Sequence, residues 1–234
     1  MKIEKSRILI TGGSLGIGKE TAKQLVQQGA KVIITGRDKY RLEQSAKETG
    51  AIPFVFDISD FKYIKQNAKK CISLLDGKID AIINNAGIGV FPKLGEVKIE
   101  DFQQVYATNV FGLTLLTQEV VEIFKTQNYG NIVNIGSTAS LKGFVGGTVY
   151  ASSKFALRGM TQSWQAELRK YNIRVSLVNP SEVTTAFANE QRIEKEELSN
   201  KLNSEEIAHT ILSVLKMRDK GFIPEVTVWA TNPF

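Results

Sequence analysis

The sequence predicts an α/β fold in which helices cover both faces of one doubly wound parallel sheet. Seven short apolar runs, rich in β-branched residues, alternate with longer stretches of helical periodicity. Continuous apolar runs are typical of strands buried on both faces, and their alternation with helices favours parallel pairing. A glycine-rich turn, Thr11–Gly18, follows the first run and opens the first helix.

The strands and helices are expected to alternate along the whole chain. The strands are expected at Arg7–Thr11, Lys31–Thr35, Ile52–Phe56, Ile79–Asn84, Asn131–Ile135, Arg174–Val178 and Glu225–Trp229. The helices are expected at 17–28, 38–49, 60–75, 99–127, 150–171 and 204–217. No repeat or linker interrupts the pattern, so residues 1–234 are expected to form one domain.

The stretch 181–203 is the exception to this alternation. It is polar, has no strand pattern and lies between a strand and the last helix. Its charge-rich part, Glu190–Glu197, is expected to be helical. A surface excursion and a lid over the substrate both remain open, because long loops in compact domains are often lids.

Composition and charge are ordinary for a globular protein. The formal net charge is +6, but basic and acidic residues are interspersed, and no basic cluster with aromatics suggests nucleic-acid binding. A solvated basic surface and attraction for a phosphorylated cofactor both explain this charge. No apolar run approaches the roughly 20 residues that span a bilayer, and the N-terminus lacks a signal-peptide core, so a cytoplasmic location is expected. Cys71 and His209 are the only residues of their types, so neither an intrachain disulfide nor a metal site is expected.

The glycine-rich turn has the spacing of a dinucleotide site. Gly12, Gly16 and Gly18 are spaced as Gly-x-x-x-Gly-x-Gly after a strand and before a helix. Glycine permits a tight turn and lets the backbone approach a pyrophosphate, while the helix N-terminus offers free N–H groups. The turn residues expected to bind the cofactor are Gly12, Ser14, Leu15, Gly16, Ile17 and Gly18.

The end of the second strand indicates which dinucleotide is preferred. Folds that prefer NAD usually place a carboxylate there for the ribose 2′-hydroxyl. This chain has Gly36 followed by Arg37, whose planar fork of donors can pair with a 2′-phosphate. NADP(H) is therefore the expected cofactor, with NAD(H) possible. The alternative is that Arg37 is a surface residue before a helix that Asp38 caps.

Three further side chains could transfer a proton to a carbonyl oxygen. Lys154 follows Tyr150 by four residues, so the two share one face of a helix. The lysine charge favours the phenolate and is expected to lower the tyrosine pKa from about 10, making Tyr150 a better general acid or base. Ser137 carries a hydroxyl that could donate to the same oxygen. Each residue alone also has a structural explanation, as a turn serine or a solvated helix face.

These residues together resemble the short-chain dehydrogenase/reductase family, and the resemblance covers essentially the whole chain. The matching segments are Thr11–Gly18, Asp57, Asn84–Gly87, Asn109, Ser137 followed 13 positions later by Tyr150, Lys154, and Asn179–Pro180 with Thr185. The resemblance implies a Rossmann-like fold of about seven strands in the order 3-2-1-4-5-6-7. It also implies oxidation or reduction between a carbonyl and an alcohol.

The resemblance extends to roles for individual residues. Asn109, Ser137, Tyr150 and Lys154 would be catalytic, with Lys154 also binding the nicotinamide ribose and Asn109 linking it to solvent through a water. Asn109 could instead be mainly structural. Further cofactor contacts would come from Asp57, Ile58, Asn85, Ala86, Gly87, Tyr150, Pro180, Val183 and Thr185.

The chain departs from the family pattern at two places. Ser181 stands where the family commonly has glycine, so a left-handed backbone there would be strained. The chain ends in Trp229–Phe234 rather than in the glycine-rich tail of the family's carrier-protein reductases. We interpret the two tryptophans, Trp164 and Trp229, as packing or interface residues rather than cofactor contacts.

Three functions remain open on the sequence. The first is an NADPH-dependent oxidoreductase of a ketone or aldehyde, or of the corresponding alcohol. The second is a 3-oxoacyl-acyl-carrier-protein reductase of fatty-acid synthesis, and the third is a non-catalytic NADP sensor. The substrate pocket is expected between Ile88–Phe91, Thr138–Phe144 and 181–203, with an apolar component from Phe91, Phe144 and Phe187. In relatives the helices matching 99–127 and 150–171 pair across a two-fold axis, so a homodimer or homotetramer is expected.

Overall fold

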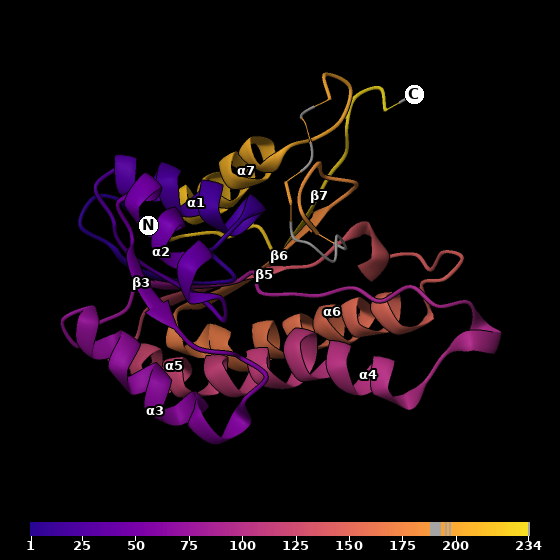
Figure 1. Ribbon diagram of the computed structural model, residues 1–234. Helices are drawn as coiled ribbons and strands as arrows, with labels where there is room; N and C mark the ends of the chain where they lie inside the picture. Colours follow the sequence, from indigo (N-terminus) through magenta and orange to yellow (C-terminus); the bar gives the residue numbers. More distant parts are fainter. Residues whose placement is uncertain (188–192, 195, 197, 234) are drawn as a thin grey trace.

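The computed structural model describes residues 1–187, 193, 194, 196 and 198–233. Within this part of the chain, seven parallel strands form one sheet in the order β3-β2-β1-β4-β5-β6-β7, which confirms the expected fold (Figure 1). The strands are β1 Arg7–Thr11, β2 Lys31–Gly36, β3 Ile52–Val55, β4 Ala81–Asn84, β5 Gly130–Ile135, β6 Ile173–Pro180 and β7 Glu225–Val228.

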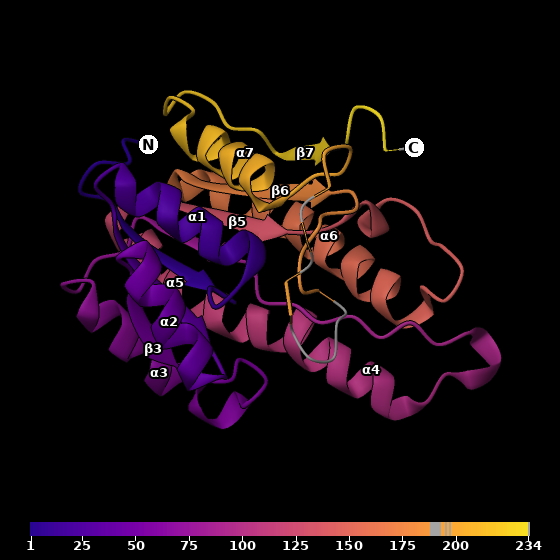
Figure 2. The same ribbon diagram turned by 45° about the horizontal axis from the view of Figure 1, so that its top comes forward.

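Helices cover both faces of the sheet and enclose two apolar cores (Figures 1 and 2). One face carries α1 Gly16–Gln27, α2 Lys39–Thr49 and α7 Ser204–Lys216. The opposite face carries α3 Phe61–Leu74, α5 Leu113–Gln127 and α6 Thr148–Leu168, with α4 Ile99–Tyr106 leading into α5. Successive residues of β1 alternate between the two cores, because a strand presents side chains to both faces. Two-sided burial explains why the strands are continuous apolar runs.

The helix expected over 99–127 is divided by a π-helical turn, Ala107–Gly112, between α4 and α5. Gly112 lies so close to the carbonyl of Ile58 that a Cβ there would collide with it. Asn109, inside the turn, bonds to both backbone groups of Ile88. The helical register therefore changes at the turn where this helix contacts Ile58 and Ile88. The periodicity of the sequence alone does not reveal this change.

The other helix boundaries differ from expectation by a few residues. The helix expected over 150–171 begins at Thr148 and ends at Leu168, followed by the 3₁₀ turn Arg169–Tyr171. Asp38 caps α2 by accepting the N–H of Arg41 at 3.0 Å. Further 3₁₀ turns lie at Leu94–Glu96 and Thr138–Ser140.

The two ends of the stretch 181–203 lie side by side. Val183 pairs with Leu202 in an isolated bridge, and the N–H of Thr184 donates to the Leu202 carbonyl at 2.8 Å. The helix expected over Glu190–Glu197 falls largely outside the described residues, and Ile193, Glu194 and Glu196 are not helical. No helix in the described parts of the chain is long and apolar enough to cross a membrane.

Candidate active site

A cavity of about 970 Å³ opens at the carboxyl ends of the strands, where ligands bind in sheets of this type. It gathers residues from separate segments along most of the described chain, from Gly12 to Trp229. Of the expected site residues, it is lined by Gly12, Ser14, Leu15, Gly16, Ile17, Arg37, Asp57, Ile58, Asn85, Ala86, Gly87, Ser137, Tyr150, Lys154, Pro180, Val183 and Thr185. Gly18 and Asn109 do not line it but support residues that do.

The glycine turn is built by close backbone contacts. Gly12 has a φ of 68°, and a Cβ on Gly18 would collide with the Gly12 carbonyl oxygen. Asn85 Nδ2 donates to the carbonyls of Thr11 and Gly12 at 3.1 and 2.9 Å, while Thr11 Oγ1 accepts the N–H groups of Asn85 and Ala86. The end of β4 therefore holds the turn in place.

The N-terminus of α1 already contacts an anionic group. The N–H of Gly16 donates to Glu194 Oε1 at 2.8 Å. A carboxylate at a helix N-terminus meets the same free N–H groups and partial positive charge that favour a phosphate. The turn is thus arranged to bind an anion.

Two arginines, Arg37 and Arg41, line the cavity beyond the end of β2, and each lies beside an aspartate. Arg37 is exposed, with its guanidinium 4.0 Å from Asp57 Oδ2. Arg41, which sequence reasoning missed, lines the cavity and binds Asp38 Oδ2 through Nε at 2.8 Å. Hydrogen bonds from Arg41 hold the pKa of Asp38 below its ordinary value. Asp57 accepts from Ser59 at 2.9 and 2.7 Å. The cation of Arg41 could have been suspected from its place one turn into α2.

Ser137, Tyr150 and Lys154 come together in the lining of the cavity. Ser137 ends the loop after β5, and its Oγ accepts the N–H of Ala139 at 3.1 Å. Tyr150 and Lys154 lie one turn apart on α6. Lys154 Nζ donates to the Ile135 carbonyl at 2.8 Å and lies 5.8 Å from the centre of the Tyr150 ring.

The pKa of Tyr150 moves in the direction opposite to the sequence-based expectation. Burial raises the pKa of Tyr150 to about 12, although a hydrogen bond with Ser137 offsets part of the rise. Burial also lowers the pKa of Lys154 to about 8. The expectation was wrong because it counted the lysine charge and not the desolvation of both groups, which only tertiary packing creates.

The side chain of Asn109 forms hydrogen bonds with the backbone of Ile88 and the side chain of Ser153. Its Oδ1 accepts the N–H of Ile88 at 2.9 Å, and its Nδ2 donates to the Ile88 carbonyl and to Ser153 Oγ at 3.0 and 3.1 Å. A Cβ on Gly87 would lie 3.5 Å from Asn109 Oδ1 and 3.7 Å from Lys154 Nζ, so both side chains border Gly87. A structural role is therefore present, and the water link to Lys154 stays a prediction.

The left-handed backbone that would have strained Ser181 is absent. The φ of Ser181 is not in the left-handed region, and its N–H donates to the Val228 carbonyl at 2.9 Å. The pairing of β6 with β7 continues through Pro180. Serine is accommodated because the backbone here avoids the left-handed region, and the Ser181 N–H continues the bonding of β6 to β7 by one residue.

Aromatic side chains surround Tyr150 on its cavity side. The Tyr150 ring lies 5.3 Å from Phe91 and 5.5 Å from Phe187 between ring centres, and Phe144 lies 6.0 Å from Phe91. All three phenylalanines line the cavity, as the sequence suggested. Trp229, interpreted above as a packing or interface residue, also lines the cavity and is 66% exposed. Its position depends on the pairing of β7 with β6, which local sequence does not encode.

A metal centre finds no support in the described residues. Among them, no group of three or more His, Cys, Asp or Glu side chains is placed to hold a metal ion.

Comparison with known proteins identifies what this arrangement resembles. A family model described as short chain dehydrogenase matches residues 6–196. A 3-oxoacyl-(acyl-carrier-protein) reductase of Thermotoga maritima is 35% identical, with 91% of each chain aligned. An NADP-dependent 3-hydroxy acid dehydrogenase of Schizosaccharomyces pombe is 32% identical over 99% of this chain and 95% of its own. Among solved structures, a metagenomic short-chain oxidoreductase in complex with NADP superposes with a TM-score of 0.83 at 29% identity, covering 97% of this chain and 98% of its own.

Proposed function

This chain belongs to the short-chain dehydrogenase family and is an oxidoreductase that interconverts carbonyl and alcohol groups, and we propose that it reduces an apolar ketone or aldehyde with NADPH. The observation that carries the proposal is the meeting of Ser137, Tyr150 and Lys154 in one cavity. The same cavity is lined by an anion-binding turn and by an aromatic cluster. This arrangement suits a dinucleotide and a carbonyl substrate side by side.

The lining fits a phosphorylated nicotinamide dinucleotide. The N–H of Gly16 already donates to a carboxylate, and Arg37 and Arg41 line the cavity where we expect a 2′-phosphate to bind. Asp38, the carboxylate that could serve NAD, is occupied by Arg41. When bound, the reduced cofactor supplies a hydride to the substrate carbon. The relative from fission yeast and the superposed oxidoreductase are both described with NADP.

In the proposed reaction Tyr150 is the general acid. Because its pKa is about 12, its hydroxyl is protonated at neutral pH and can donate to the carbonyl oxygen. Ser137 donates a second hydrogen bond to the same oxygen. Lys154, with a pKa of about 8, is mainly a cation at pH 7 and stabilises the phenolate as the proton leaves. In the oxidation of an alcohol the same groups work in reverse.

The aromatic cluster supports an apolar substrate. Phe91 and Phe187 flank the Tyr150 ring, and Phe144 extends this surface beyond Phe91. Burying an apolar substituent against such rings is favourable, and aromatic faces prefer planar or branched apolar groups. Phe187 belongs to the stretch 181–203, which we propose acts as a lid over this surface.

A second candidate is reduction of 3-oxoacyl thioesters on acyl carrier protein. The similarity to the Thermotoga maritima enzyme over 91% of each chain favours it. The C-terminal segment counts against it, because Trp229 reaches the cavity where this chain departs from the glycine-rich tail of that subfamily. A sensor without catalysis is disfavoured, since a sensor does not need the three proton-transfer groups.

The protein is also proposed to act as a homodimer or homotetramer in the cytoplasm. Apolar side chains exposed along α5 and α6 support the first point. The single cysteine, which cannot form a disulfide within the chain, supports the second.

The decisive experiment follows NADPH oxidation at 340 nm with a panel of apolar ketones, aldehydes and acetoacetyl thioesters, repeated with NADH. We expect turnover of an apolar ketone or aldehyde, with higher kcat/KM for NADPH. Preference for the thioester would establish the second candidate. Cofactor binding without turnover of any substrate would establish a sensor, and faster turnover with NADH would contradict the cofactor assignment.

A further inference from the structure

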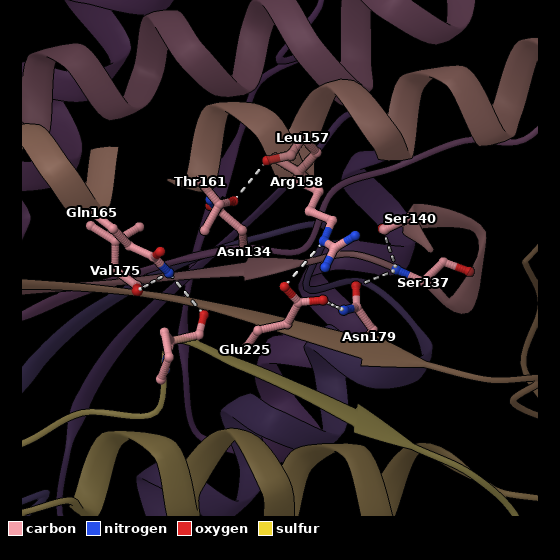
Figure 3. Close-up of polar contacts among 11 residues, drawn as sticks. Asn134, Ser137, Ser140, Leu157, Arg158, Thr161, Gln165, Val175, Asn179 and Glu225 are labelled. Atoms are coloured by element: carbon pink, nitrogen blue, oxygen red, sulfur yellow. Dashed lines mark hydrogen bonds and ion pairs between the residues drawn. The ribbon is translucent and has the colours of Figure 1, made fainter. Parts of the chain in front are cut away.

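A chain of hydrogen bonds links strand β7 to the backbone of Ser137 (Figure 3). Arg158 Nε donates to Glu225 Oε2 at 3.1 Å, and Asn179 Nδ2 donates to Glu225 Oε1 at 3.0 Å. Asn179 Oδ1 in turn accepts the N–H of Ser137 at 3.3 Å, and Ser140 Oγ shares this N–H at 3.2 Å. Glu225 therefore accepts one bond through each oxygen, from two different elements.

These bonds connect the two elements that carry the proposed proton-transfer groups. Arg158 lies on α6, four residues after Lys154 and eight after Tyr150, so the three belong to one stripe of the helix. Asn179 lies near the end of β6, next to the loop that carries Ser137. Glu225 thus braces α6 against the Ser137 loop.

The carboxylate of Glu225 sets the direction of every bond in this chain. A carboxylate only accepts, so Asn179 must turn its Nδ2 toward Glu225 and its Oδ1 toward Ser137. Asn179 is fully buried. A reversed amide would place donor against donor and acceptor against acceptor in the interior, where unsatisfied polar groups are costly. Gly136 makes this approach possible, because a Cβ there would collide with Asn179 Oδ1.

We propose that Glu225 is a positioning residue: it fixes the amide of Asn179 and thereby the place of Ser137 relative to Tyr150. The inference rests on the proposed function, which assigns Ser137 and Tyr150 their roles. The Arg158 and Glu225 side chains are 35% and 26% exposed, and ion pairs exposed to solvent contribute little to stability. Loss of the carboxylate should therefore affect the geometry of Ser137 more than the stability of the fold.

The first test is Glu225→Gln. The introduced amide has one acceptor for two donors, so either Arg158 or Asn179 must lose its partner or turn. We expect kcat to fall about 10- to 100-fold, the size of loss that small misplacements of catalytic groups produce. The KM for NADPH and the melting temperature should change little, because neither the cofactor turn nor either apolar core is touched.

The second test restores the bond directions with different residues. In the double variant Glu225→Gln/Asn179→Asp, the carboxylate at position 179 accepts from Ser137 and from the new amide, whose oxygen accepts from Arg158. We expect kcat to recover to within about threefold of the unaltered protein. The single variant Asn179→Asp, which sets two carboxylates against each other, should be impaired.

The control is Gln165→Leu. Gln165 Nε2 joins α6 to the carbonyls of Val175 and Pro224, next to Glu225, without any link to Ser137 (Figure 3). This variant should lower the melting temperature and leave kcat unchanged. Equal losses of kcat in Glu225→Gln and Gln165→Leu, or a double variant that folds but does not recover, would overturn the proposal.

A readout without turnover separates this inference from the proposed function. Amide hydrogen exchange in peptides covering 136–140 should be faster in Glu225→Gln, restored in the double variant and unchanged in Gln165→Leu. If the unaltered protein turns over no substrate of the panel, the proposed function fails, while the exchange pattern still decides whether Glu225 holds Ser137. Unchanged exchange in a folded Glu225→Gln protein would refute the inference.

Discussion

Tyr150 and Lys154 lie one helical turn apart, and burial shifts the pKa of each in the direction that favours its neutral form. The pKa of Tyr150 rises to about 12 and that of Lys154 falls to about 8. The tyrosine is therefore held protonated at neutral pH, as a proton donor requires. The lysine retains its charge at pH 7, and among the described residues its hydrogen bond goes to the Ile135 carbonyl rather than to a carboxylate.

Removing the phenolic hydroxyl should abolish reduction and spare the fold. In Tyr150→Phe we expect kcat to fall by about 10²- to 10⁴-fold, because the proton donor is lost. The dissociation constant for NADPH, measured by fluorescence titration, should stay within about twofold. Tyr106→Phe, on α4 outside the cavity lining, serves as the control and should keep full activity. Activity of Tyr150→Phe within tenfold of the unaltered protein would contradict the assignment.

Burial of Lys154 should also make stability depend on pH. Its pKa falls from an ordinary 10.5 to about 8, so between these pH values the unfolded chain binds more protons than the folded one. The free energy of unfolding therefore rises with pH across this window. Tyr150, whose pKa rises from 10.0, reverses the trend above pH 10, since the unfolded phenol then loses a proton that the folded one keeps.

Thermal unfolding from pH 7 to 9.5 tests this dependence. Lys154→Met should melt about 5 °C higher than the unaltered protein at pH 7, because no buried charge remains, and the difference should shrink as the pH rises. Lys39→Met, which removes an exposed lysine on α2, should give no such trend. A constant difference across the pH range would show that burial of the lysine charge is not the cause.

At the scale of single elements, the π-helical turn Ala107–Gly112 changes the course of a helix that periodicity predicts as continuous. The turn directs Asn109 toward Ile88 and places Gly112 against the Ile58 carbonyl. One element thereby supports both the loop beside Lys154 and the loop of Asp57 and Ile58, which is expected to contact the cofactor. An ordinary α-helical register would bring other side chains to these positions.

Gly112→Ala should show how closely the π-helical turn is packed. A Cβ at this position would collide with backbone oxygens of Ile58 and Ala107, which cannot move aside as a flexible side chain can. We expect a melting temperature lower by about 5–10 °C, in keeping with overpacking costs of about 1–3 kcal/mol. Gly159→Ala is the matched control, because nothing lies within 4 Å of a Cβ there on α6. That substitution should leave the protein as stable or slightly more so, and similar losses in both variants would argue against the packing explanation.

At the scale of the whole molecule, apolar surface remains exposed outside both cores. Phe111, Leu115 and Phe155 are 50%, 37% and 44% exposed along the π-helical turn, α5 and α6. Thr114 on α5 lies 3.3 Å from the sulfur of Met160 on α6, so the two helices present one continuous surface. An apolar surface of this kind is typical of an interface between subunits.

Charges on this surface should separate the subunits of the proposed oligomer. The double variant Leu115→Glu/Phe155→Glu should sediment as a monomer, because burying two carboxylates in an apolar contact is strongly unfavourable. Leu74→Glu, at the end of α3, places a charge on an equally exposed leucine and should leave the oligomer intact. Sedimentation velocity on the three proteins makes the comparison, and a monomeric unaltered protein would refute the oligomer itself.

Much of the fold and of the site follows from local patterns in the chain. Two-sided burial requires continuous apolar runs, so seven strands could be predicted from residue type alone. The glycine turn and the spacing of Ser137, Tyr150 and Lys154 are equally local, because a turn or a helical repeat determines which groups face together.

Other properties depend on which distant segments pack against each other. The direction of the Tyr150 pKa shift, the π-helical turn and the contributions of Arg41, Trp229 and Glu225 arise from contacts that no periodicity records. Desolvation and hydrogen-bond direction depend on the residues that surround a group in three dimensions. In this site those residues include Ser137 and Glu225, which are 88 positions apart in the sequence and are linked through Asn179. The amino-acid sequence specifies which groups react, and tertiary packing determines their protonation state and their orientation, because both depend on contacts between distant segments.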